Sequence, residues 1–256
     1  MTNATTPATK TFAPMVDSTK PTLLDELREK SEALRAEGEA ARRPLEDGIR
    51  EIDRILWRAF RWIDEAVGHL AVIRPQVGHT FHLGQIMSLE RPRFERAFVS
   101  FRRKPVANIE VLEHVELFYR LDGDKPVILR VPPMQAGSIE ERLRTSTMPY
   151  QYQTEHDERR VVRYGVFHVQ PQITSTVRLE PDYREQTIHV ALRNIDRFES
   201  LHLEFQPDKV NEAALEQLVK FMLGESNGFI RLAPLKLIRG MRQEVPVSPA
   251  AAASRS

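Results

Sequence analysis

Residues 44–73, PLEDGIREIDRILWRAFRWIDEAVGHLAVI, decide the fold of this chain. Apolar side chains recur there at alternating steps of four and three residues, at Leu45, Ile49, Ile52, Leu56, Ala59, Ile63, Ala66, Leu70 and Ile73. This heptad spacing predicts one long helix that packs along another element through a continuous apolar seam. At about 1.5 Å per residue, the helix would be roughly 40 Å long. The stretch therefore predicts association rather than chemistry.

The seam has two interpretations. Further apolar residues, Ile55, Phe60, Trp62 and Val67, flank it, so the stripe is wide and the helix should contact more than one neighbour. We favour a seam that faces a second copy or a protein partner. Its predicted interface residues are Ile49, Ile52, Leu56, Ala59, Ile63, Ala66 and Leu70. The alternative is a core helix of a monomeric domain.

A weaker seam precedes the main one. In a predicted helix over about residues 21–41, the three-four spacing falls on Leu24, Leu27, Ser31, Leu34, Gly38 and Ala41, among many charged residues. Pro44 follows, and proline disfavours an uninterrupted helix. We therefore expect either a helical hairpin or a kinked rod at residues 38–44.

The rest of the chain predicts an antiparallel sheet with covering helices, which makes the fold class α+β. Alternation is clearest in residues 173–180, 187–193 and 201–205. Matching their apolar faces places Leu192 opposite Leu201, and His189 opposite Glu204. Two local signals add to this pattern. Asp122-Gly123 predicts a hairpin between strands at 109–121 and 126–131, and Asn211 and Gly224 predict the two ends of a helix.

These patterns give a domain plan. The expected parts are a disordered tail at 1–20, a helical hairpin or coiled-coil region at 21–75, a sheet domain at 76–240 and a second disordered tail at 241–256. Strands followed by a helix occur twice in the sheet domain, over 85–145 and 161–224. This order suggests a duplicated ββββα unit, although the two segments share no repeat at the level of residues.

Composition excludes several classes of function. The chain has 37 Lys and Arg against 36 Asp and Glu, so its overall charge does not indicate nucleic acid or membrane binding. It has no cysteine, which excludes disulfides and cysteine chemistry. No run approaches eighteen apolar residues, so no membrane-spanning helix is expected. The N-terminus does not resemble a signal peptide, which favours a cytoplasmic location.

Catalytic motifs are scarce. The chain contains neither GxGxxG nor GxxxxGK[ST], and HExxH and GxSxG are also absent. His168, His189 and His202 lie in predicted strands, but the expected register keeps them too far apart to share a metal ion. We expect no metal and no cofactor. The remaining catalytic candidates are Glu110, His114 and Glu116, because a histidine between carboxylates on one strand face suits acid–base chemistry.

A basic run gives a second functional hypothesis. Residues 91–104 contain Arg91, Arg93, Arg96, Arg102, Arg103 and Lys104, together with Phe94, Phe98 and Phe101. Basic and aromatic side chains in alternation are typical of single-stranded nucleic acid binding. The leading hypothesis remains a structural or adaptor protein that self-associates or binds a protein partner. The alternatives are this nucleic-acid module and a small-ligand or catalytic sheet domain around His114.

Overall fold

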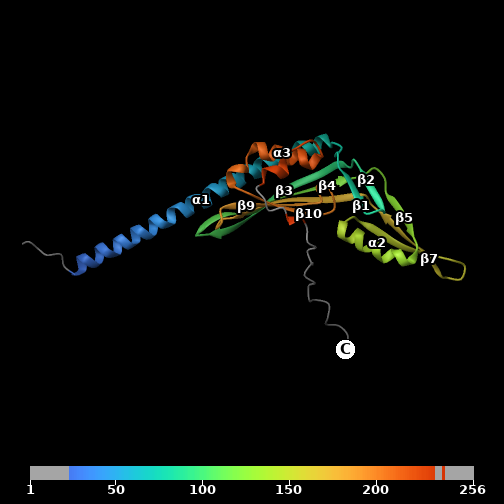
Figure 1. The fold of residues 1–256 in the computed structure, drawn as a ribbon, viewed down its shortest axis with the longest axis horizontal. Helices are drawn as coiled ribbons and strands as arrows, with labels where there is room; N and C mark the ends of the chain where they lie inside the picture. Colours follow the sequence, from blue (N-terminus) through green and yellow to red (C-terminus); the bar gives the residue numbers. More distant parts are fainter. Residues whose placement is uncertain (1–22, 234–237, 240–256) are drawn as a thin grey trace, which may run out of the picture. The chain divides into compact units, whose positions relative to one another are not determined.

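The computed structural model describes residues 23–233 and 238–239 of the chain, and the predicted tails at 1–20 and 241–256 lie outside these residues. The fold is α+β, as expected (Figure 1). Its helices are α1 (Leu23–Ile73), α2 (Pro133–Ser146) and α3 (Glu212–Leu223), with short 3-10 helices η1 (Pro207–Lys209) and η2 (Phe229–Leu232). Its strands are β1 (Thr80–Leu83), β2 (Met87–Glu90), β3 (Arg93–Val106), β4 (Ile109–Asp122), β5 (Val127–Val131), β6 (Tyr150–His156), β7 (Val162–Val169), β8 (Gln172–Asp182), β9 (Thr187–Arg193), β10 (Ser200–Phe205) and β11 (Ile238–Arg239).

The chain divides into two compact units, residues 1–45 and 46–256. The boundary lies near Pro44 rather than at residue 75, because the seam after Pro44 packs into the sheet domain. Pro44 itself lies within α1, so residues 38–44 form no hairpin turn. Each unit is described below by itself.

A six-stranded antiparallel sheet dominates the second unit, with strand order β11-β10-β9-β8-β4-β3. Residues 46–73 of α1, and α3, cover one of its faces (Figure 1). The opposite face carries mostly polar side chains. We call it the outer face. It is defined by Arg96, Phe98, Ser100 and Arg102 on β3, His114, Glu116 and Phe118 on β4, Thr176, Arg178 and Glu180 on β8, His189, Ala191 and Arg193 on β9, and Ser200, His202 and Glu204 on β10.

The register of the last strands confirms the sequence prediction. Leu201 pairs with Leu192 and Glu204 pairs with His189. Strands β8, β9 and β10 follow one another in a meander. Each alternates apolar residues toward the helices and polar residues toward the outer face, and this alternation fixes the register. Helix α3 also has the predicted ends. The Asn211 side chain accepts a hydrogen bond from the Ala214 N–H, and Gly224 adopts a left-handed conformation after the last turn.

A second sheet, β5-β7-β6, is inserted between β4 and β8, and α2 packs against β7. The hairpin predicted at Asp122-Gly123 was therefore wrong. Strand β5 pairs with β7, while β4 pairs with β3 and β8. The Gly123 N–H donates to the Pro171 carbonyl at 2.7 Å, so this glycine continues the pairing of β4 with β8 instead of closing a turn toward β5.

The order of elements does contain four strands and a helix twice, as β2 to α2 and as β7 to α3. The strand pairing does not follow these two blocks. Strands β3 and β4 share the six-stranded sheet with β8, β9 and β10, whereas β5 and β7 belong to the smaller sheet. A duplicated unit therefore stays a prediction.

The turn between β8 and β9 is held by Asp182. Its Oδ1 accepts hydrogen bonds from the Arg184 and Glu185 N–H groups at 2.9 and 3.0 Å. The hydrogen bond from Glu185 contributes most to lowering the Asp182 pKa below its usual value.

We predict that Asp182→Ala lowers the free energy of unfolding by about 1 kcal/mol at pH 7, because two turn N–H groups lose their acceptor. A lowered pKa means that this stabilisation is present above the pKa of an unfolded aspartate and is lost as the pH falls through the folded value. Urea unfolding at pH 7 and at acid pH would measure it. The difference from wild type should shrink in acid, and the control Glu185→Ala should change little. An equal loss at both pH values would contradict the prediction.

Candidate functional site

The structure brings the predicted interface residues together in the core of the second unit. Ile49, Ile52, Leu56, Ala59, Ile63 and Leu70 are buried, and Ala66 is half-buried. All six buried residues belong to the same hydrophobic cluster as the strands of the sheet. Their spacing is therefore explained by a helix that lies on its own sheet. An interface with a partner would need these side chains to be exposed, but they are buried against the sheet of the same chain.

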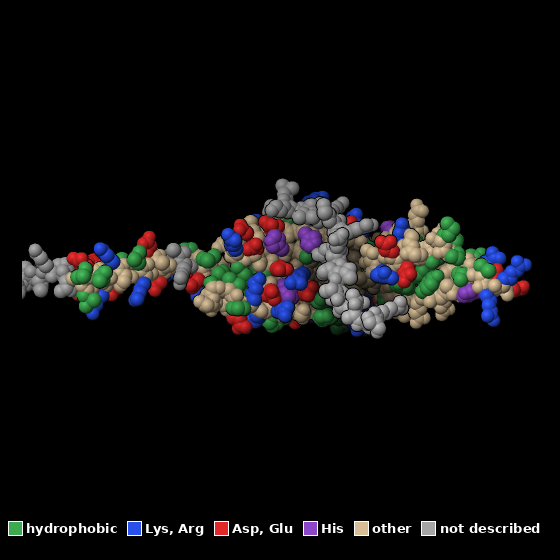
Figure 2. Space-filling view, turned by 90° about the horizontal axis from the view of Figure 1, so that it is seen from below, with side chains coloured by type: hydrophobic (Ala, Val, Ile, Leu, Met, Phe, Trp, Pro, Cys, Tyr) green, Lys and Arg blue, Asp and Glu red, His purple; other side chains and the backbone are tan. Residues whose placement is uncertain are grey.

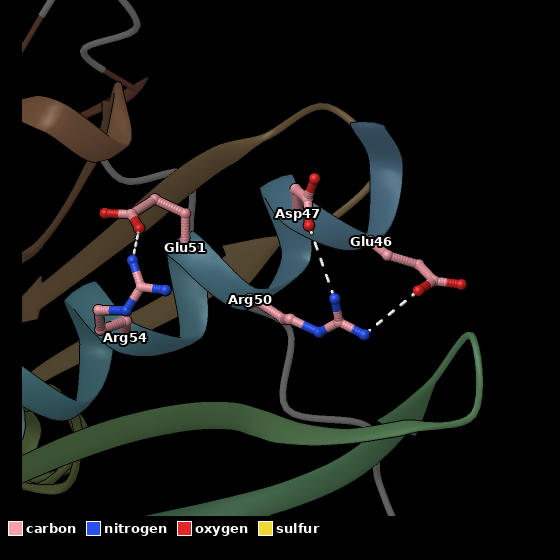
Figure 3. Close-up of polar contacts among 5 residues, drawn as sticks. All are labelled: Glu46, Asp47, Arg50, Glu51 and Arg54. Atoms are coloured by element: carbon pink, nitrogen blue, oxygen red, sulfur yellow. Dashed lines mark hydrogen bonds and ion pairs between the residues drawn. The ribbon is translucent and has the colours of Figure 1, made fainter. Parts of the chain in front are cut away.

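The opposite side of this helix is solvated. Arg50 forms ion pairs with Glu46 at 3.3 Å and with Asp47 at 3.5 Å, and Arg54 pairs with Glu51 (Figure 3). These are pairs three or four residues apart on a helix surface, which stabilise an exposed helix modestly. Residues 46–73 thus have one face for the sheet and one for water.

The first unit differs in this respect. Between Leu23 and Leu45, every side chain that the structure describes is exposed, and these include Leu23, Leu24, Leu27 and Leu34. The exposed fractions of Leu27 and Leu34 are 55% and 69%. Leu24, Leu27 and Leu34 belong to the weaker seam of the sequence. The main seam begins only at the end of this unit, with Leu45, which is also exposed.

The catalytic candidates are not assembled into one cluster. A β-bulge in the pairing of β3 with β4, between Arg102 and Arg103, changes the alternation of β4. Leu112 consequently points into the core, while His114 and Glu116 lie on the outer face. Glu110 instead forms an ion pair with Arg103 at 3.2 Å. Of the three candidates expected on one strand face, His114 and Glu116 share the outer face, whereas the bulge turns Glu110 to the other side, because the sequence pattern assumed a regular strand.

His114 is held by an arginine rather than by carboxylates. The Arg178 Nη2 lies 3.2 Å from His114 Nδ1. A guanidinium can only donate, so His114 Nδ1 is the acceptor in this contact. His114 is half-buried on the outer face.

The basic run of residues 91–104 is divided between several places. Arg91 lies in the turn between β2 and β3 with a positive φ, and Arg93 begins β3. Arg96 and Arg102 lie on the outer face with Phe98. Arg103 pairs with Glu110, and Lys104 is half-buried opposite Val111. Of the predicted basic patch, only Arg96 and Arg102 therefore lie on the same face of the sheet as Phe98.

The three phenylalanines of this run separate in the same way. Phe94 is buried and stacks on Tyr119 with ring centroids 5.7 Å apart. Phe101 packs on the other side of β3 from Phe98, against Trp57 and Phe60 of α1. Phe98 stacks on Phe118 across the strands with ring centroids 4.9 Å apart. Phe98 is therefore the one aromatic residue of the run on the outer face.

Comparison with protein-family models, with curated proteins and with solved structures gives no match.

Histidines and acidic residues of the described chain do not form a metal site. No group of three or more His, Cys, Asp or Glu side chains in residues 23–233 and 238–239 could hold a metal ion. His189 lies 3.7 Å from Glu204, as the predicted register required, and His168 is in the smaller sheet. In the same residues, none of the helices combines the length and the apolar character needed to cross a membrane.

Sequence reasoning missed a hollow on the outer face. Ala191 lies between Arg178 on β8 and His202 on β10, and its short side chain leaves a depression of about 180 Å³. Two guanidinium groups, a histidine, two hydroxyls and one carboxylate line it, from Arg178, Arg193, His202, Thr176, Ser200 and Glu116. Figure 2 shows charged and histidine side chains on this face of the second unit. The signal in the sequence is an alanine among polar residues at the outward positions of β9.

Proposed function

We propose that this protein is a structural or adaptor protein that self-associates through the first unit of α1, residues 23–45. The observation that supports the proposal is the exposure of Leu23, Leu24, Leu27 and Leu34 on a helix whose described side chains have no covering neighbour within that unit. Isolated helices of this length are marginal in water, and most helical stability in proteins comes from packing an apolar face. A second helix would supply that packing.

The composition of the seam suits a close helical contact. Ser31 and Gly38 occupy seam positions between and after the leucines, and a Cβ added at Gly38 would meet nothing within 4 Å. Small residues at such positions let another helix approach. Each leucine side chain removed from water contributes about 1.5–3 kcal/mol, so three or four per copy are enough for a specific pair.

Charge favours a second copy of this chain in the antiparallel direction. Residues 23–33 contain four acidic and two basic residues, whereas residues 34–45 contain two acidic and three basic residues. Antiparallel pairing places the acidic beginning of one helix beside the basic end of the other, and it does so twice. In this proposal the helix supplies association, and the sheet domain of each copy supplies a second surface.

The test is the mass of the full chain in solution. We expect wild type to sediment as a dimer at micromolar concentration, and Leu27→Asp with Leu34→Asp to sediment as a monomer, because both new carboxylates fall in the seam. The matched control is Ala36→Asp with Ala40→Asp, which adds the same charge on the opposite face of the helix. Circular dichroism should show that the sheet domain of every variant melts normally.

Two results would contradict the proposal. One is a wild-type chain that stays monomeric up to high micromolar concentration. The other is a dimer that both double variants weaken equally, because then the leucines would have no specific part in it.

A further inference from the structure

A row of side chains crosses five strands of the outer face. Strand pairing sets Phe98 opposite Phe118, Phe118 opposite Thr176, Thr176 opposite Arg193, and Arg193 opposite Ser200. Neighbouring strands lie about 4.8 Å apart, so β4, which carries the aromatic ring, and β9, which carries the guanidinium, are about 10 Å apart. The row therefore has a flat aromatic end and a cationic, hydroxyl-bearing end.

The aromatic end is exposed. Phe98 has 60% of its surface in contact with solvent, and its ring is nearly parallel to that of Phe118, with an interplanar angle of 18°. Aromatic rings on an open sheet are the platform on which proteins stack unpaired bases, and every base has a π-face that such a platform can accept.

The cationic groups beside this stack are available. The side chains of Arg96 and Arg193 form no ion pair or hydrogen bond with another described residue, although the side chains of most arginines of this domain do. Arg96 lies two residues before Phe98 on β3, and Arg193 lies at the far end of the row. A backbone that passes over the phenylalanines would thus meet a guanidinium on either side.

The hollow beside Ala191 adds a place for one phosphate. Arg193 can donate paired N–H groups to an oxyanion, and the Thr176 and Ser200 hydroxyls can add single hydrogen bonds. Arg178 also lines the hollow, but its guanidinium is engaged by Glu180 at 3.3 Å and by His114 at 3.2 Å. Glu116 opposes an anion there, so Arg193 is the guanidinium of the hollow that has no side-chain partner among the described residues.

We propose that the outer face binds single-stranded nucleic acid, with a base stacked on Phe98 and Phe118 and a neighbouring phosphate in the hollow beside Ala191. A duplex would not fit this arrangement, since its bases are already stacked and the flat sheet offers no element to enter a groove. The site differs from the basic run of residues 91–104, because β8, β9 and β10 supply half of it.

Fluorescence anisotropy with a labelled oligonucleotide of about twelve nucleotides would test this on the full chain at low salt. We expect binding that weakens as salt rises, a loss of about tenfold for Phe98→Ala, and a several-fold loss with a shallower salt dependence for Arg193→Gln. Glu116→Gln should tighten binding. The controls are Ile128→Ala, an exposed apolar residue of the other sheet, and Arg197→Gln, whose guanidinium is held by Asp196 and Glu199.

Several outcomes would overturn the proposal. These are no binding at low salt, equal affinity for a duplex of the same length, or an affinity that Phe98→Ala leaves unchanged while the control variants behave normally. A nucleoside monophosphate that binds as tightly as the oligonucleotide would replace it with a small-ligand site.

Discussion

Ile63→Asp should unfold the sheet domain rather than release a partner. Ile63 is 1% exposed and lies on the face of α1 that packs on the sheet. The substitution removes a buried apolar side chain and places a carboxylate inside the hydrophobic cluster, which costs several kcal/mol. A domain of this size has roughly 5–15 kcal/mol to lose. We therefore expect a melting temperature at least about 10 °C lower, or no folded protein at all.

Thermal melting followed by circular dichroism, together with sedimentation, would measure this result. The control is Arg61→Asp, which introduces the same carboxylate two residues away on the exposed side of the helix. It should melt within a few degrees of wild type. If Ile63→Asp instead kept the wild-type melting temperature and only halved the mass, the seam would face a partner, contrary to the packing described above.

Asp53→Ala should have the second largest effect, because Asp53 completes the hydrogen bonding of a buried bulge. Its Oδ1 accepts a hydrogen bond from the Leu112 N–H at 2.7 Å, and the Tyr183 hydroxyl donates to the Leu112 carbonyl at 2.6 Å. Leu112 is fully buried where β3 and β4 shift register. Alanine leaves a buried N–H without an acceptor, which costs about 1–3 kcal/mol.

Chemical unfolding would give this difference in free energy. Asp53→Asn keeps an oxygen in the same place and should recover most of the stability, so a loss as large as that of Asp53→Ala would mean that the hydrogen bond is not the cause. Tyr183→Phe should cost about 1 kcal/mol. A double variant should show coupling, since both side chains hold the backbone of the same residue, Leu112.

The sequence predicted those parts of the fold that local pattern determines. Alternation in β8, β9 and β10 gave the correct register, because a slip of one residue would turn every apolar side chain to the outer face. The ends of α3 followed from Asn211, whose side chain caps the first turn, and from Gly224, whose backbone freedom ends the last turn. Both effects act within one helical turn. The seam was recognised as a packed helix, but its spacing could not reveal whether a sheet or another helix covers it.

Features that depend on distant pairing were not predictable in this way. Asp122-Gly123 has the composition of a hairpin turn, yet its glycine binds Pro171, almost fifty residues later. The pairing of Phe98 with Phe118 depends on a tight turn at Ala107 and Asn108, which both have positive φ. Asn108 was the available signal, because asparagine adopts that conformation more readily than most residues. Recognising it would have predicted the hairpin but not this pair. A regular ladder from Val106 opposite Ile109 sets Phe98 opposite Leu117, and the bulge between Arg102 and Arg103 brings Phe118 there instead.

The contact between Gly78 and Gly224 has a consequence for how this protein can vary. A Cβ at Gly78 would lie 2.7 Å from the Gly224 carbonyl oxygen, and one at Gly224 would lie 2.7 Å from the His79 nitrogen. Main chain meets main chain there, so no rotamer change can make space. In a scan of every possible substitution, these two positions should accept as few other residues as the buried core positions do. This would hold although Gly78 is exposed to solvent and neither glycine contributes a side chain.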